Sequence, residues 1–468
     1  MPTDGMKSDM EESVLYPTDI RLLEVSTATE EFAYRTPMKF GGRVVTDVVL
    51  LHVTARVETR DGRIGEGFGS MPVGNVWAWP SDTVSGDASL AAMISMGKRV
   101  ATLAEQYTLA GHPLSITHEL SQEYQSQAEN IVVLSNLAEP MPRLAQLVTA
   151  SPTEAAIFDA QAKALGQNSY NLLGADFVET SLATYLDETF AGEYLDGYTL
   201  REPKPTMPLY HLVGALDPLT DTDIDQRLND DLPETLSEWI VADGLTHLKI
   251  KLNGDDLAWD LERVVSIDRI ATEAQQRRGC SDWYYSADFN EKCANVEYVL
   301  DFLGQLQEHA PEAFRRLQYI EQPTHRDLRA NPENRMHRAA EIKPVVIDES
   351  LVDFQSLLLS RELGYSGVAL KACKGHGEAL LMGAAAQKLG MFLCVQDLTC
   401  PGASFMHSAS LSARIPTVAA IEGNARQYCP AANKGWSDRF PSMFEIADGR
   451  LGTSVLDGPG IWGYLSRN

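Results

Sequence analysis

The stretch Val345-Val346-Ile347-Asp348-Glu349-Ser350 joins three β-branched residues directly to two acids. Four more short apolar runs in the second half of the chain carry charged or polar residues in the same way: His247-Leu248-Lys249-Ile250-Lys251, Ser286-Ala287-Asp288-Phe289-Asn290, Tyr319-Ile320-Glu321-Gln322-Pro323 and Val368-Ala369-Leu370-Lys371. Longer amphipathic stretches separate the runs, and they predict helices over 257–277, 295–309, 354–364 and 378–389. A β/α alternation sustained over this length predicts a parallel α/β barrel rather than a doubly wound sheet.

The charged residues of these runs fall on one face of each predicted strand, because successive side chains of a strand point to opposite faces. They are Lys249, Lys251, Asp288, Glu321, Asp348 and Lys371. The apolar partners would face the helices and the charged residues the barrel axis. Charged residues at the carboxyl ends of barrel strands are typical of a catalytic centre.

Asp288, Glu321 and Asp348 would come from three consecutive strands. Converging carboxylates raise one another's pKa, and a bound divalent cation removes that cost. Ligation by oxygen atoms with open positions for water suits Mg²⁺, and Mn²⁺ is possible. The alternative to a metal site is that these acids form a set of salt bridges that closes the barrel.

The lysines would supply the acid–base chemistry. Lys249 and Lys251 lie side by side, and neighbouring cations and burial both favour a neutral amine, so Lys251 is expected to act as a general base. Lys249 would contact a substrate carboxylate or tune Lys251. Lys371 comes from a strand across the barrel and would face the other side of a bound substrate, with a structural ion pair as its alternative role.

The rest of the chain suggests a second domain. We expect a loose tail over 1–18, an α+β domain over 19–150 and the barrel over 151–439, with an insertion near 175–205 that serves as a lid or an interface. Ser151-Pro152-Thr153-Glu154 predicts a helix start with proline at its first position. Gly166 predicts the end of that helix.

Composition excludes several classes of function. The formal net charge of −26 makes nucleic acid and anionic membranes poor partners. No uncharged apolar stretch is long enough to predict a transmembrane helix, and the polar N-terminus does not resemble a signal peptide. None of the six cysteines forms a CxxC pair, which fits a reduced, cytoplasmic setting. No GxGxxG or Walker-type loop is present.

Five motifs in order resemble the enolase superfamily, and within it the muconate lactonizing enzyme-like subgroup of the mandelate racemase/muconate lactonizing enzyme family. They are KxK at 249–251, DxN at 288–290, EQP at 321–323, DES at 348–350 and LKACK at 370–374. The resemblance implies a modified (β/α)7β barrel with an α+β capping domain, built from the N-terminal region and completed by about residues 440–468. It also implies Mg²⁺ on Asp288, Glu321 and Asp348, an acid–base pair of Lys251 and Lys371, and a homo-oligomer.

The chemistry implied by the resemblance is removal of a proton α to a carboxylate through an enediolate. A racemase, epimerase or cycloisomerase of a small carboxylic acid is the first expectation, and an acid-sugar dehydratase, a carbon–oxygen lyase, is the second. Two further hypotheses are a Mg²⁺-dependent hydrolase on an unrelated barrel and a non-catalytic descendant that keeps only the fold. The seventh strand lacks the histidine of the mandelate racemase subgroup, and Glu422-Gly423-Asn424 lacks the DxD of dipeptide epimerases, which puts dipeptide epimerisation in doubt.

Candidate substrate contacts are Glu422, Asn290, Lys39, Arg43 and Trp77. The segments 38–43, with the glycine pair Gly41-Gly42, and 74–80 could close over a substrate and expel water. The alternative is a surface loop whose aromatic residues pack on the barrel. His376 and His407 are expected to be ordinary loop or helix histidines.

Overall fold

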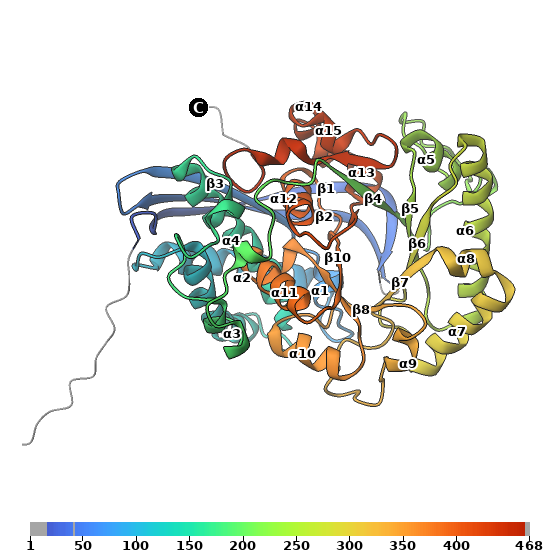
Figure 1. The fold of residues 1–468 in the computed structure, drawn as a ribbon, viewed down its shortest axis with the longest axis horizontal. Coiled ribbons are helices and arrows are strands. Elements are labelled where there is room, and N and C mark those ends of the chain that lie inside the picture. The colour runs from blue at the N-terminus through green and yellow to red at the C-terminus, as the bar shows by residue number, and fades with distance from the viewer. Residues whose placement is uncertain (1–15, 41–42, 464–468) are drawn as a thin grey trace, which may run out of the picture.

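Eight parallel strands close into a barrel in the computed structural model, which describes residues 16–40 and 43–463 (Figure 1). The strands are β4 Thr206–Val213, β5 His247–Lys251, β6 Tyr284–Asp288, β7 Leu317–Glu321, β8 Val345–Ile347, β9 Gly367–Leu370, β10 Phe392–Val395 and β11 Ile421–Glu422. Strand β11 pairs in parallel with β4, which closes the ring. The predicted barrel is therefore confirmed.

Helices surround this barrel (Figure 1). They are α5 Leu236–Asp243, α6 Leu257–Arg278, α7 Val296–His309, α8 Pro311–Arg316, α9 His337–Ala340, α10 Phe354–Glu362, α11 His376–Lys388 and α12 Gly402–Arg414. The short helices α13 Ala425–Tyr428, α14 Trp436–Arg439 and α15 Pro441–Phe444 follow the last barrel strand. The four helices that the amphipathic pattern predicts correspond to α6, α7, α10 and α11.

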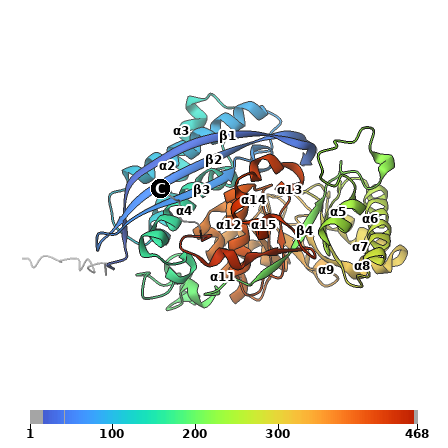
Figure 2. The ribbon, with the colours of Figure 1, turned by 90° about the horizontal axis from the view of Figure 1, so that it is seen from above.

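The N-terminal part forms the capping domain. Its antiparallel sheet consists of β1 Ile20–Phe40, β2 Arg43–Thr59 and β3 Ile64–Pro72, and its helices are α1 Asn75–Ala78, α2 Gly86–Gln106, α3 Pro113–Leu134 and α4 Arg143–Leu165. Seen from above, the long strands β1 and β2 run from the cap helices towards α13 of the barrel (Figure 2). The rings of Tyr34 on β1 and Tyr428 on α13 lie 6.3 Å apart at that junction.

The predicted helix start at Ser151 is wrong. Helix α4 begins at Arg143, and Pro152 lies inside it. Proline has no N–H and cannot donate to the carbonyl group four residues earlier, that of Val148. The hydroxyl of Ser151 donates to this oxygen instead, at 2.8 Å. The neighbouring serine thus satisfies the carbonyl group that proline leaves free, and the helix continues.

Helix α4 lies directly on strand β3 because that strand carries glycine on the facing side. Gly65, Gly67 and Gly69 alternate along it, and a Cβ atom on each would come within 2.1, 2.1 and 1.9 Å of the carbonyl oxygens of Ala160, Ala156 and Pro152. Glycines two residues apart on the strand thus face helix residues that are four residues apart. The absence of side chains at these three positions sets the distance between sheet and helix.

The segment 175–205 contains three short 3-10 helices and packs on the outside of the barrel. The ring of its Phe190 meets that of Phe354 on α10 at 6.1 Å, and Lys388 on α11 pairs with Glu193 at 2.7 Å. A role as a lid or as an interface stays a prediction.

The C-terminal segment returns to both parts of the molecule. Strand β12, Arg450–Gly452, pairs antiparallel with β4. The backbone N–H of Ile461 then donates to Asp159 of α4 at 2.9 Å. The domain boundaries near 150 and 440 stay predictions, and most of the expected tail over 1–18 lies outside the described residues. Within the described ranges, no helix has the length and apolar character needed to cross a bilayer.

Replacing Gly67 by alanine is expected to lower the free energy of unfolding by about 1–3 kcal/mol, because the new methyl group would overlap the backbone of α4. Urea denaturation measures the change. The matched control is Gly304→Ala in helix α7, where a Cβ atom meets nothing within 4 Å. That change should stabilise the protein by roughly 0.5–1 kcal/mol. Equal effects of the two substitutions would contradict the packing described above.

Candidate active site

The charged side chains meet at the carboxyl ends of the barrel strands. Strands β5 and β9 are four positions apart in a ring of eight and therefore lie on opposite sides of the barrel. Lys251 ends β5, and Lys371 directly follows β9. Asp288 and Glu321 are register partners at the ends of β6 and β7, and Asp348 directly follows β8. The three acids thus come from the strands between the two lysines.

The lysines of β5 hold one side of this cluster. Lys249, 1% exposed, places its Nζ 2.9 Å from Glu321, 2.7 Å from Glu422 and 3.1 Å from Asp288. Lys251 Nζ lies 2.5 Å from Oδ2 of Asp288. Lys249 is therefore enclosed by acids, and Glu422, which the sequence suggests as a substrate contact, is its partner.

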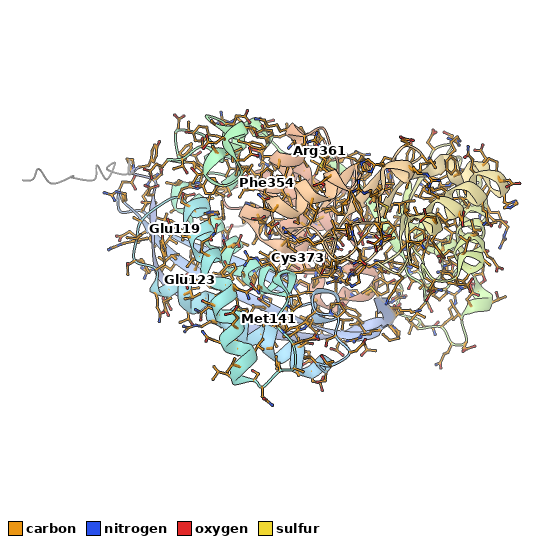
Figure 3. All side chains as sticks on the ribbon, turned by 90° about the horizontal axis from the view of Figure 1, so that it is seen from below. Glu119, Glu123, Met141, Phe354, Arg361 and Cys373 are labelled. Carbon is orange, nitrogen blue, oxygen red and sulfur yellow. The ribbon has the colours of Figure 1, made fainter. Side chains whose placement is uncertain are left out.

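The other side is built around Asp348. Its Oδ2 lies 2.6 Å from Lys371 Nζ, and its Oδ1 lies 3.1 Å from Lys374 Nζ. Lys374 also donates to the backbone oxygen of Asp348 at 2.5 Å. Both lysines are buried. Figure 3 marks the region by Cys373, which lies between the cap helix that carries Glu119 and Glu123 and the barrel.

These pairings shift the pKa values of the acids in different directions. Burial alone would raise the pKa of Asp288 and of Asp348. The ammonium groups of Lys251 and Lys249 outweigh it at Asp288 and hold the pKa below its usual value, and Lys371 and Lys374 hold the pKa of Asp348 at about 2. Burial and the charge of Asp288 raise the pKa of Glu321 well above its usual value.

The expectation that burial and a neighbouring cation favour a neutral amine is wrong for Lys249, and Lys371 is shifted in the same direction. Burial lowers the pKa of Lys249, but Glu321, Glu422 and Asp288 outweigh it, and the pKa is raised. Burial likewise lowers the pKa of Lys371, and Asp348 reverses this shift. The attraction of the carboxylates outweighs burial at both ammonium groups and decides the direction.

In this structure the acids of the cluster form ion pairs with the lysines. Within the described residues, no group of three or more His, Cys, Asp or Glu side chains is gathered as a metal site. The donors nevertheless suit a hard divalent cation, because Asp288, Glu321 and Asp348 supply carboxylate oxygens from consecutive strands. Burial and the charge of Asp288 raise the pKa of Glu321, and a cation bound at the carboxylates would counter both effects. Mg²⁺ on these residues stays a prediction.

The capping domain covers the cluster with Trp77. This residue of α1 is 5% exposed, and its ring lies 4.4 Å from Lys371 Nζ and 5.7 Å from Lys374 Nζ. Its Nε1 donates to Oε1 of Glu349 at 2.8 Å. Burial raises the pKa of Glu349 to about 8, and Asp348 adds to the shift. The 74–80 segment thus packs an aromatic side chain directly on the barrel.

A cleft of about 520 Å³ opens beside Trp77, between the cap and the loops that follow β6, β7 and β8. Its lining includes the predicted contacts Arg43, Trp77 and Asn290. Lys39 lies on β1 opposite Val44, is partly buried, and is not among the residues that line this cleft. Gly41 and Gly42, the expected hinge, lie outside the described residues.

Two polar residues of the site carry no signal of their own in the sequence. Gln396 follows β10, the seventh strand of the barrel, and its side-chain amide donates to Glu321. The side-chain amide of Asn424 lies 3.4 Å from the carboxylate of Glu422. An amide that follows an apolar strand is too common to indicate a site, so only the folded structure identifies these two.

Two other residues stand inside the motifs but have roles that the motifs do not predict. Gln322 of EQP accepts from the backbone N–H groups of Asp348 and Ser350 and ties the ends of β7 and β8 together. Lys374 ends the LKACK motif, and the 3-10 turn 372–374 brings it back beside Lys371.

His376 and His407 lie in helices α11 and α12, as expected. Their rings meet at 2.9 Å between Nδ1 of His376 and Nε2 of His407. Burial lowers the pKa of both, so the pair is neutral and structural.

Residues 231–461 match the family model described as Enolase C-terminal domain-like. The matched stretch spans seven of the eight barrel strands, β5 to β11. The resemblance carried by the five motifs is thereby confirmed. No curated protein matches the sequence.

Solved structures of the enolase superfamily share the fold over nearly the whole chain. The L-Ala-D/L-Glu epimerase from Bacillus subtilis is 17% identical with a TM-score of 0.61, covering 94% of this chain and 98% of its own. The dipeptide epimerase from Enterococcus faecalis V583, in complex with Mg and L-Leu-L-Tyr, is 16% identical with a TM-score of 0.59, covering 94% and 99%. The muconate lactonizing enzyme from Pseudomonas fluorescens, in complex with muconolactone, is 17% identical with a TM-score of 0.57, covering 94% and 95%.

Asp348→Asn is expected to lower the free energy of unfolding by about 3–5 kcal/mol in the absence of divalent cations, because it leaves the buried ammonium groups of Lys371 and Lys374 without a counter-charge. Chemical denaturation measures the loss. Asp353→Asn is the control. Asp353 caps α10 through the N–H of Ser356, and asparagine caps a helix equally well, so stability should hardly change. If the two variants were equally stable, the ion pairs of Asp348 would not support the fold.

Proposed function

We propose that this chain is a Mg²⁺-dependent isomerase that moves a proton on the carbon α to a carboxylate through an enediolate. The activity would be that of a racemase or epimerase, or of a cycloisomerase, acting on a small carboxylic acid. The observation that carries the proposal is the placement of Lys251 and Lys371 on opposite sides of the barrel with three acids between them. The named structural neighbours, which are epimerases and a muconate lactonizing enzyme, support the kind of reaction.

Two lysines on opposite sides of a substrate suit proton transfer across a planar carbon, because one removes the proton from one face and the other returns it to the opposite face. Asp348 holds Lys371 in the ammonium form, which suits it to return the proton. Lys251, in its neutral amine form, would remove the proton from the other face, and in the reverse direction the roles exchange. A lysine on one side only would exchange the proton without inverting the carbon.

The remaining residues prepare the site for this transfer. Lys249 supplies a fixed positive charge among the acids of β6, β7 and β11. Trp77 keeps bulk water from Lys371, since its ring covers the ammonium group and is itself buried. A Mg²⁺ held by Asp288, Glu321 and Asp348 would supply the charge that stabilises the carboxylate as the proton leaves.

Assembly as a homo-oligomer and a cytoplasmic setting stay predictions. All six cysteines are free in the structure.

The proposal predicts separate effects of the two lysines. Exchange of the α-proton is followed by NMR in D₂O with Mg²⁺ and a panel of chiral carboxylates as single enantiomers. Lys251→Ala and Lys371→Ala should each abolish inversion, while each should lower exchange by roughly 100-fold or more for only one enantiomer, the opposite one in each variant. The reason is that each lysine faces only one side of the carbon.

Lys343→Ala is the matched control. Lys343 precedes β8 at the amino end of the strand and packs on the ring of Phe314 at 4.4 Å, so it should leave both exchange and inversion unchanged. Inversion at the wild-type rate in either active-site variant, or no exchange of any acid by the wild-type protein, would overturn the proposal.

A further inference from the structure

A glutamate of the capping domain reaches the segment of the barrel that carries two of the buried lysines. Glu154 lies on helix α4 and is 4% exposed. Its Oε2 and Oε1 lie 2.7 and 2.9 Å from the position that a Cβ atom on Gly375 would occupy. The φ of Gly375 is +104°, which side chains rarely adopt, so the backbone conformation and the nearby carboxyl group both require glycine.

Gly375 is the last residue before helix α11, and it has no side chain that could cap this helix. The backbone N–H groups of His376 and Gly377, in the first turn of α11, form hydrogen bonds to Glu154 instead. The first N–H groups of a helix have no partner within it, and buried ones need a partner from elsewhere. Glu154 thus caps a barrel helix from the capping domain.

The capped end of α11 is directly joined to the lysines. Only the turn 372–374 and Gly375 separate Lys371 from the helix. The backbone N–H of Lys374 donates to the backbone oxygen of Lys371 at 3.0 Å, and that of Gly375 donates to the oxygen of Ala372 at 3.2 Å. Helix α4 packs on this turn, and α4 lies beside α11 (Figure 2). A shift of the first turn of α11 would therefore move both lysines.

The lysine on the opposite side of the barrel is held in a different way. Helix α6 follows Lys251, and its own Asp256 caps it by accepting the backbone N–H of Trp259 at 3.1 Å. The cap of α6 is thus local, whereas the cap of α11 comes from another domain. Loss of the Glu154 carboxyl group should accordingly disturb Lys371 and leave Lys251 in place.

We propose that Glu154 is a positioning residue for Lys371. By capping α11 from the capping domain, it holds the turn that places Lys371 and Lys374 against Asp348 and beneath the ring of Trp77. The inference rests on the proposed function, and it adds a residue that acts on only one of the two faces of the substrate. Docking of the two domains would then set the geometry of one lysine.

The ionisation of Glu154 decides which substitution preserves the cap. Burial, together with the charge of Glu378 on α11, raises the pKa of Glu154 to about 8, although the two N–H groups and Arg143 act in the opposite direction. The carboxyl group is therefore largely uncharged at pH 7. Glutamine is uncharged, has the same length and keeps an oxygen acceptor, whereas alanine has no acceptor. Glutamine should preserve the cap that alanine removes.

The first test needs no substrate. The protein is acetylated with N-hydroxysuccinimidyl acetate at pH 7, and mass spectrometry of its peptides gives the rate at each lysine. Glu154→Ala should raise the rates at Lys371 and Lys374 by roughly tenfold, because local opening of the turn exposes their amines. The rate at Lys251 should stay within about threefold of the wild-type value, and so should all three rates in Glu154→Gln.

The matched control removes a buried cap from a barrel helix that carries no site lysine. Thr235 is 2% exposed and caps α5 by accepting the backbone N–H of Glu238 at 3.3 Å. Thr235→Ala should leave the rates at Lys371 and Lys374 unchanged. A general loss of stability would instead raise the rates at all the buried lysines alike.

The second test uses the exchange of α-protons in D₂O with Mg²⁺ and single enantiomers of the chiral carboxylates. Glu154→Ala should slow exchange by roughly tenfold for the enantiomer that Lys371→Ala fails to exchange, and by less than about threefold for the other. Glu154→Gln should restore both rates to within about threefold of the wild-type values. A purely structural role would slow both enantiomers equally.

Two results would overturn the inference: acetylation of Lys371 at the same rate in Glu154→Ala and in the wild-type protein, or an equal loss of exchange for both enantiomers. Faster acetylation confined to Lys371 and Lys374, without exchange of any acid by the wild-type protein, would support the positioning role and count against the proposed function. Exchange by the wild-type protein with unchanged acetylation in Glu154→Ala would do the reverse.

Discussion

Balancing buried charge is the constraint on which the rest of this structure depends. Four ammonium groups and four carboxylates lie almost without exposure to solvent at one end of the barrel: Lys249, Lys251, Lys371 and Lys374, and Asp288, Glu321, Asp348 and Glu422. A buried charge without a partner is costly, so each of these groups is tolerable only because another strand supplies its counter-charge. The closed ring of strands brings these side chains together, and the cluster in turn requires that the ring close in this register.

The capping domain completes this environment. Trp77 covers Lys371 and Lys374 and ties the cap to Glu349 of the barrel through its indole N–H. The cap can hold that position because α4 packs on the glycine side of β3 and because the C-terminal segment binds both β4 and α4. Packing far from the site thus holds in place the cap that excludes water from the lysines. Exclusion of water strengthens every electrostatic interaction within the site.

The sequence predicts the barrel and the charged cluster well because both follow from local rules. Alternation along each strand places Asp288 and Glu321 on the inner face, and the order of the motifs places Lys371 across from Lys251. The hydrogen bonds and charge environments of single side chains follow no such rule. The role of Ser151 in keeping α4 continuous through Pro152 depends on one side-chain hydrogen bond that competes with a strong helix-start signal. The sign of the pKa shift of Lys249 depends on which charges lie closest, which only the folded structure decides.

The most direct test of this account is the binding of Mg²⁺ to the protein, measured by titration calorimetry at several pH values. If the acids of β6, β7 and β8 form one cation site that the ammonium groups otherwise occupy, each chain should bind one Mg²⁺. The affinity should weaken as the pH falls, because Glu321, whose pKa burial and the charge of Asp288 raise, then takes up a proton and loses its negative charge. Two results would contradict this account. One is the absence of saturable binding at millimolar Mg²⁺, and the other is that the variants Asp288→Asn and Asp348→Asn bind Mg²⁺ as tightly as the wild-type chain.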